Sequence, residues 1–141
     1  MARKKTIRFE ENFEGELFGI VTQLKDYRLC WYINKELSFD LIRMDDIEII
    51  HKKKNRTSVF SLFRFENDLD KLLVHLVSNK HQGEHLISEV RQADFILVIH
   101  GEVNSGMKDD FFSSLKNIPS IQLVVPIDSS KLKSKENLVF E

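Results

Sequence analysis

Histidine and cysteine are the residues of this 141-residue chain best suited to catalysis or metal binding. The single cysteine, Cys30, could act as a nucleophile with a histidine that the fold brings to it. His81 and His85 stand four residues apart, which lets two imidazoles share a metal ion when both lie on one helix face. Gly83 lies between them in a segment that we predict to be a turn. We therefore expect solvated histidines there, and no bound metal or cofactor.

Cys30 belongs to an unusual dozen residues, Asp26–Leu37, which also contain the only tryptophan and both tyrosines of the chain. Apolar residues recur every four positions, which predicts a short amphipathic helix: Leu29, Ile33 and Leu37. Asp26 is expected to cap its first amide groups. Cys30 lies a full turn inside this helix, whereas activated thiols favour helix starts. We therefore interpret it as a small core residue.

The other side of this predicted helix carries a candidate contact surface for a partner: Arg28, Trp31, Tyr32 and Lys35. Aromatic and arginine side chains are the usual anchors of protein interfaces. The occupant would be an unknown protein partner or a second copy of the chain in a homodimer. The alternative is that Trp31 and Tyr27 pack into the sheet as large core residues.

A basic stretch at residues 51–56 suggests a second kind of partner. Four positive charges could contact single-stranded nucleic acid at the tip of a hairpin: Lys52, Lys53, Lys54 and Arg56. Phe60, Phe63 and Phe65 follow closely and could supply stacking surfaces. The alternative is that these phenylalanines build the core while the charged tip solubilises the hairpin and blocks edge pairing.

A small enzyme of unknown reaction is a further alternative, with Cys30, Tyr27, Arg28 or His100 in a pocket. His100 ends a predicted buried strand beside Gly101, where a histidine bonded to backbone is the simpler interpretation. The chain contains no glycine-rich phosphate loop, dinucleotide fingerprint or nucleophile elbow. The sequence therefore favours a non-enzymatic binding or adaptor domain and predicts no catalytic residue.

Charge and composition limit the class of protein. With 21 basic and 22 acidic residues, the net charge of -1 gives no overall attraction to nucleic acid or anionic membranes. A hydrophobic content of 42% with 5 Gly and 2 Pro predicts one globular domain over residues 1–141. One cysteine cannot form an internal disulfide, so we expect a cytoplasmic protein. No apolar run approaches the ~18 residues that would span a bilayer.

The apolar pattern predicts an α+β fold, in which two main helices pack on a single layer of mostly antiparallel sheet with six or seven strands. The central strand is expected at residues 93–100, which are apolar on both faces. The other candidates for the six or seven strands are the extended segments at residues 6–9, 17–22, 39–43, 47–51, 58–65, 72–78 and 121–125. The helices are expected at Asp26–Leu37 and residues 107–116.

Single residues mark special positions in these elements. Gly19, inside its strand, indicates a bulge or a close approach of another backbone. Asp45 and Asp46 are expected to interrupt the extended chain. Pro119 ends the second helix, because proline cannot extend it. Asp128 is expected to cap a short helix that runs through Leu132.

Short motifs over nearly the whole chain form a recognisable set: residues 17–20, 26–31, 33–35, 37, 78–80, 94–95, 118–128, 131–132 and 136–138. This set resembles the bacterial IPExxxVDY family. The chain departs from the motif that names the family, because Ser120 stands where glutamate is expected and Val124-Val125-Pro126 replaces Val-Asp-Tyr. The family is uncharacterised, so the resemblance implies no activity and no catalytic residues.

Overall fold

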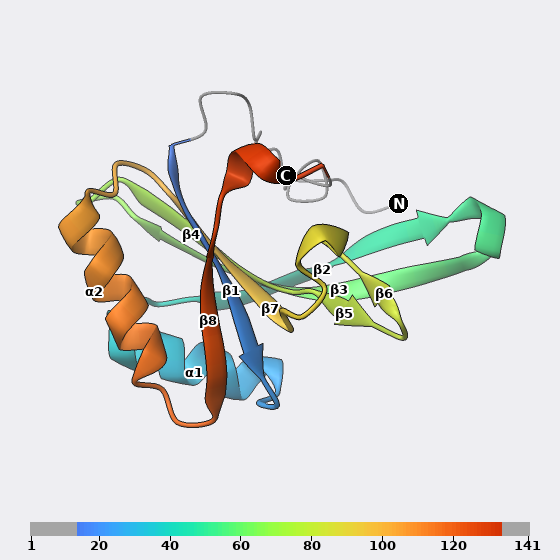
Figure 1. The fold of residues 1–141 in the computed structure, drawn as a ribbon, viewed down its shortest axis with the longest axis horizontal. Helices are drawn as coiled ribbons and strands as arrows, with labels where there is room; N and C mark the ends of the chain where they lie inside the picture. The colour runs from blue at the N-terminus through green and yellow to red at the C-terminus, as the bar shows by residue number, and fades with distance from the viewer. Residues whose placement is uncertain (1–13, 134–141) are drawn as a thin grey trace.

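The computed structural model describes residues 14–133 of the chain (Figure 1). The strand expected at residues 6–9 and the motif at residues 136–138 lie outside this range. The elements follow in the order β1 (Gly15–Thr22), α1 (Asp26–Leu37), β2 (Ile42–His51), η1 (Lys52–Lys54), β3 (Arg56–Asn67), β4 (Leu72–Ser78), β5 (Lys80–His81), β6 (Glu84–His85), η2 (Ser88–Val90), β7 (Phe95–His100), α2 (Ser105–Lys116), β8 (Ile121–Ile127) and η3 (Ser129–Lys131).

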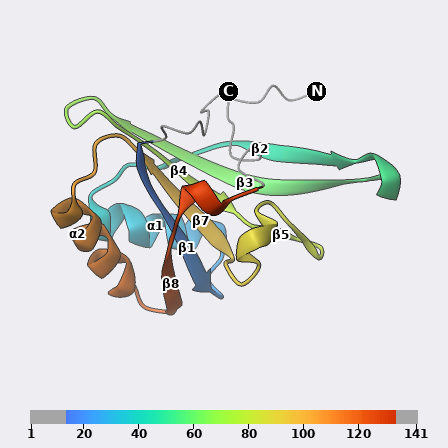
Figure 2. The ribbon, with the colours of Figure 1, turned by 45° about the horizontal axis from the view of Figure 1, so that its top comes forward.

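Within residues 14–133, six strands form one antiparallel sheet in the order β2-β3-β4-β7-β1-β8. Residues 95–99 of β7 are all buried, which confirms the expected central strand. Both α-helices pack on the same side of this sheet (Figure 2). The predicted α+β architecture, a single largely antiparallel sheet with two helices on it, is therefore confirmed.

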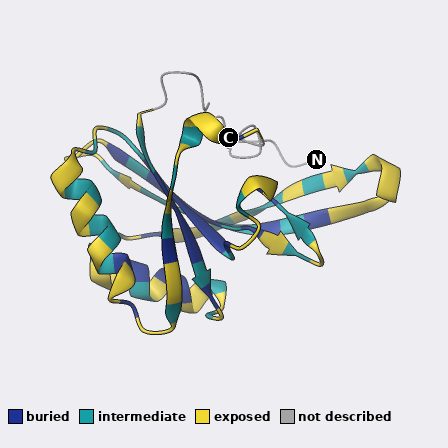
Figure 3. Cartoon of the chain, in the orientation of Figure 1, coloured by how far each residue is buried: buried dark blue, intermediate teal, exposed yellow. Residues whose placement is uncertain are grey.

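The two faces of the sheet bury separate hydrophobic clusters. On the helix side, Phe18 and Ile20 of β1 pack with Leu29 and Ile33 of α1. On the other side, Leu17 of β1 packs with residues of β3, β4 and β7. This division follows from the alternation of side chains along a strand. Figure 3 shows buried residues (dark blue) concentrated in the strands at the centre of the sheet and exposed residues (yellow) at η1.

β2 and β3 form the predicted hairpin, and its far half projects beyond the other strands (Figures 1 and 2). β3 pairs with β4 only from Leu62 onward. Before that point, the backbone N–H of Ser61 donates to Ser78 Oγ at 2.8 Å, and that of Val59 donates to His81 Nδ1 at 3.2 Å. We call residues 47–61 the arm. Side chains thus replace part of the missing strand pairing along it.

An expected interruption and an expected helix cap differ in the structure. β2 continues through Asp45 and Asp46, where the register with β3 shifts between Met44 and Ile47. Such a bulge absorbs extra residues without ending the strand. The N-cap of α1 is Lys25, which makes no side-chain cap. Asp26 lies one residue inside the helix, and its Oδ1 accepts a hydrogen bond from the Tyr27 N–H at 2.7 Å.

The close approach at Gly19 is made by side chains. A Cβ on Gly19 would lie 3.3 Å from both Ala93 Cβ and Ile127 Cδ1, and 3.7 Å from the Val125 carbonyl oxygen. Asp128 caps η3 by accepting a hydrogen bond from the Ser130 N–H. Neither helix in residues 14–133 is long and apolar enough to cross a membrane.

Candidate functional site

The outward side of α1 carries two large aromatic side chains that the fold leaves in solvent. Tyr27 is 62% exposed and Trp31 is 58% exposed. The interpretation of these two residues as core is therefore wrong. Arg28 and Lys35 are also exposed, and at about 100° per residue the four side chains fall within an arc of about 100°. We call these four residues the α1 face.

Cations and rings are interleaved on this surface. Lys35 Nζ lies 5.3 Å from the centroid of the Trp31 ring, and Arg28 Cζ lies 6.0 Å from that of Tyr32. The Trp31 and Tyr32 rings meet edge to face at 5.0 Å. Tyr32 is half-buried and packs against the helix-side core. The contacts hold the exposed ring in a defined place, each cation contributing about 0.5–1 kcal/mol at such a site.

The inward side of α1 is fixed to the sheet. Leu29 and Ile33 are fully buried. Asn34 Nδ2 donates to the Leu41 carbonyl at 3.2 Å, and Asn34 Oδ1 accepts from the Leu41 N–H at 2.8 Å. This pair of hydrogen bonds ties the helix to the residue just before β2. The sequence analysis missed it, because an asparagine inside a helix gives no signal of a distant backbone partner.

Cys30 lies beneath the helix in the core, as expected. Its Sγ donates to the Leu41 carbonyl at 3.6 Å. Burial, with a smaller contribution from the carboxylates of Asp26 and Asp40, raises the pKa of this thiol to about 11. The reactive form of cysteine is the thiolate. At neutral pH the Cys30 side chain is therefore a neutral core group.

We expect the Cys30 thiol of the folded protein to react with iodoacetamide at least ~100-fold more slowly than in the unfolded chain. The rise in its pKa from 9.0 to about 11 lowers the thiolate fraction about 100-fold, and burial slows access further. Mass spectrometry of alkylation near neutral pH, with and without urea, measures both rates. Equal rates would show that Cys30 is accessible and reactive.

A hollow of about 400 Å³ lies beside the N-terminal end of α1, between that end of the helix and the arm. Its lining is mixed in charge and includes an ion pair between Arg43 and Asp46. Cys30, Arg28 and His100 are not among its lining residues. His100 alternates with Leu97 and Ile99 of the helix-side core, and so lies on the opposite face of the sheet. The fold thus does not bring His100 together with Cys30 or Arg28 in a pocket.

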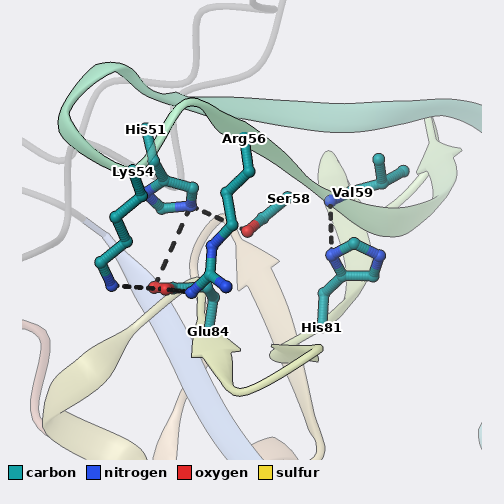
Figure 4. A network of polar contacts seen from close by, with 7 residues as sticks. All are labelled: His51, Lys54, Arg56, Ser58, Val59, His81 and Glu84. Carbon is teal, nitrogen blue, oxygen red and sulfur yellow. Dashed lines mark hydrogen bonds and ion pairs between the residues drawn. The ribbon is translucent and has the colours of Figure 1, made fainter.

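The basic tip of the arm is partly neutralised by one carboxylate. Lys54 Nζ lies 2.6 Å from Glu84 Oε1, Arg56 pairs with the same oxygen, and His51 Nε2 lies 4.0 Å from Oε2 (Figure 4). Hydrogen bonds from Lys54 and Arg56 lower the pKa of Glu84 to about 2. Lys52 and Lys53 remain exposed. Two of the four candidate nucleic-acid contacts are therefore engaged within the protein.

The phenylalanines next to this tip offer no stacking surface. Phe60 is buried in the cluster on the side away from the helices. Phe63 belongs to the helix-side core, and Phe65 packs against that core. The expectation that these rings build the core is confirmed. The tip therefore lacks the exposed aromatic groups that single-stranded nucleic acid uses.

The five histidines do not gather at one site in the described part of the chain. His81 and His85 lie on β5 and β6 of a small hairpin, and His81 is held by its bond to Val59. The rings of His75 and His100 meet edge to face at 5.7 Å, and burial lowers the pKa of His100 to about 4. Within residues 14–133, no three His, Cys, Asp or Glu side chains gather in a way that could hold a metal ion.

Asn79 is a buried structural residue that the sequence analysis did not identify as one. It is fully buried at the end of β4. Its Nδ2 donates to the carbonyls of Val90 and Ala93, each at 3.0 Å, and its Oδ1 accepts from the Ile87 N–H at 2.7 Å. The connection from β4 to β7 therefore folds around this one amide. Its neighbours in sequence are polar, which hides its burial.

Three residues at positions 118–128 have structural roles. Ser120 has a φ of 71° in the turn before β8, and its carbonyl accepts from Thr22 Oγ1 at 2.7 Å. Val124 is buried. Pro126 lies on the edge strand β8, where its missing N–H can be tolerated. No family model, no curated protein and no solved structure matches this chain.

Proposed function

We propose that this chain is a non-enzymatic binding domain that holds a protein partner on the α1 face. The observation that carries the proposal is the exposure of Tyr27 and Trp31 on a helix whose opposite side is firmly anchored. Rigid aromatic side chains give large contact areas with little loss of conformational freedom. A fixed helix that displays them resembles the surface of a binding module more than a solvated face.

The size of the aromatic surface supports this role. A tryptophan or tyrosine buries roughly 150–250 Å² when covered, and more than half of each side chain is exposed here. The exposed area of Tyr27 and Trp31 together is therefore ~200 Å². Covering it would contribute about 5 kcal/mol to the free energy of binding before the entropy of association is subtracted. Two such residues can therefore act as interface hot spots.

We also propose that the chain is a divergent relative of the bacterial IPExxxVDY family and acts in the cytoplasm. The motifs at residues 17–20 and 26–31 support the first statement, and the single buried thiol of Cys30 supports the second. Neither statement adds a reaction. Both are compatible with a binding role.

Replacing Tyr27 and Trp31 together with alanine is expected to abolish partner capture while leaving the fold intact. Loss of two hot spots weakens a complex at least ~30-fold, whereas exposed substitutions change stability by only about 1 kcal/mol in total. The immobilised full chain would be incubated with lysate of the source organism, and captured proteins quantified by mass spectrometry. Circular dichroism and urea unfolding would verify the fold of the variant.

Leu69→Ala is the matched control, because Leu69 is 95% exposed in the turn between β3 and β4. A partner retained by this control and lost from the double variant supports binding through the α1 face. Identical captured proteins for the wild type and the double variant would overturn the proposal.

A further inference from the structure

The charge carried by the α1 face has one sign. Arg28 and Lys35 flank Trp31, and neither forms an ion pair with any residue in the range 14–133. The carboxylates of the helix point elsewhere, since Asp26 and Glu36 lie at least about 80° around the helix from every residue of the face. A partner covering Trp31 therefore meets an aromatic surface bordered by two cations.

The spacing of Arg28 and Lys35 determines where a complementary partner would carry its negative charges. Arg28 and Lys35 are seven residues apart, which is about 10.5 Å along the helix axis and about two turns. A partner helix lying beside α1 would match them with carboxylates seven positions apart. Apolar side chains between those carboxylates would cover Trp31 and Tyr27. An extended segment would need closer spacing in sequence to span the same distance.

A second copy of the chain fits this surface poorly. An antiparallel symmetric contact centred near Trp31 places Arg28 of one copy against Lys35 of the other. A parallel symmetric contact places each cation against its own equivalent. Like charges meet in both arrangements and oppose association. The charge pattern therefore disfavours the homodimer that the sequence left open.

We propose that the partner presents an acidic amphipathic helix, with carboxylates seven residues apart on either side of an apolar anchor. This inference rests on the proposed function, because it names the chemistry of the partner bound by the α1 face. Arg28 and Lys35 select the partner by charge, and Tyr27 and Trp31 supply the contact area.

The test uses a displayed library of random linear peptides, selected against the full chain. Selected peptides are expected to be acidic, to have apolar residues between paired carboxylates, and to shift Trp31 fluorescence. The double variant Arg28→Glu and Lys35→Glu should bind them at least about tenfold more weakly and should itself select basic peptides. Lys52→Glu with Lys53→Glu is the control. It makes the same change in net charge at the exposed tip of the arm and should leave affinity unchanged.

The other outcomes separate the two proposals. Neutral or basic peptides that require Trp31 would overturn the acidic partner and leave the binding function standing. Two other results would overturn the proposal of an acidic partner helix, because each identifies another occupant of the α1 face. One is a dimer, detected by sedimentation, that Trp31→Ala dissociates. The other is a shift in Trp31 fluorescence with phosphatidylserine vesicles alone. If no peptide, copy or vesicle engages Trp31, both the inference and the proposed function fail.

Discussion

Alanine in place of Asn79 is expected to lower the free energy of unfolding by about 3–5 kcal/mol, because several buried groups lose their partner together and each costs roughly 1–3 kcal/mol. The Asn79 side chain bonds the carbonyls of Ile87, Val90 and Ala93 and the Ile87 N–H. No water can replace the amide without entering a fully buried site. The connection between β4 and the central strand β7 should therefore loosen.

Urea unfolding monitored by circular dichroism measures this loss. Asn79→Asp tests the donor side separately, since a carboxylate keeps an acceptor for the Ile87 N–H but cannot donate to the carbonyls. Asn67→Ala is the control. Asn67 makes comparable hydrogen bonds in the exposed turn after β3, so we expect a loss of about 1 kcal/mol there. A loss below about 1 kcal/mol for Asn79→Ala would contradict the role assigned to this amide.

The stability of the protein is expected to fall as the pH decreases from 6.5 to about 4, because burial lowers the pKa of His100 from 6.5 to about 4. Over that interval the unfolded chain binds a proton that the folded chain does not, so unfolding is favoured by acid. The slope should be about 1.4 kcal/mol per pH unit, and the total loss about 3 kcal/mol. Above pH 6.5 the contribution of His100 is fully present.

Unfolding free energies of the wild type and of His100→Gln, measured across this pH range, test the assignment. The variant should show a much flatter profile. His85→Gln, on the partly exposed β6 strand, should keep the wild-type slope. Glu84 also contributes stability that acid removes, but its lowered pKa of about 2 places that loss below pH 4.5. An unchanged slope in His100→Gln would assign the pH dependence to another group.

Sequence periodicity was sufficient for the elements that depend on local pattern. The helix Asp26–Leu37 was predicted with its observed bounds, because apolar residues every four positions specify which side faces the core. The buried strand β7 was predicted from its continuous apolar run. Helix capping was less predictable. Asp26 is the first residue inside α1 and not the N-cap residue before it. The negative charge of an aspartate in the first turn still interacts favourably with the helix dipole.

The sequence also determined the class of the fold and the place of the candidate contact surface, since both follow from periodicity and composition. The tertiary structure decided three further matters. It left Tyr27 and Trp31 in solvent, it paired Lys54 and Arg56 with Glu84 about thirty positions away, and it buried Asn79. Exposure and pairing depend on which distant segments cover a side chain. A local pattern specifies the inward side of a helix, but only the packed chain shows what lies outside it.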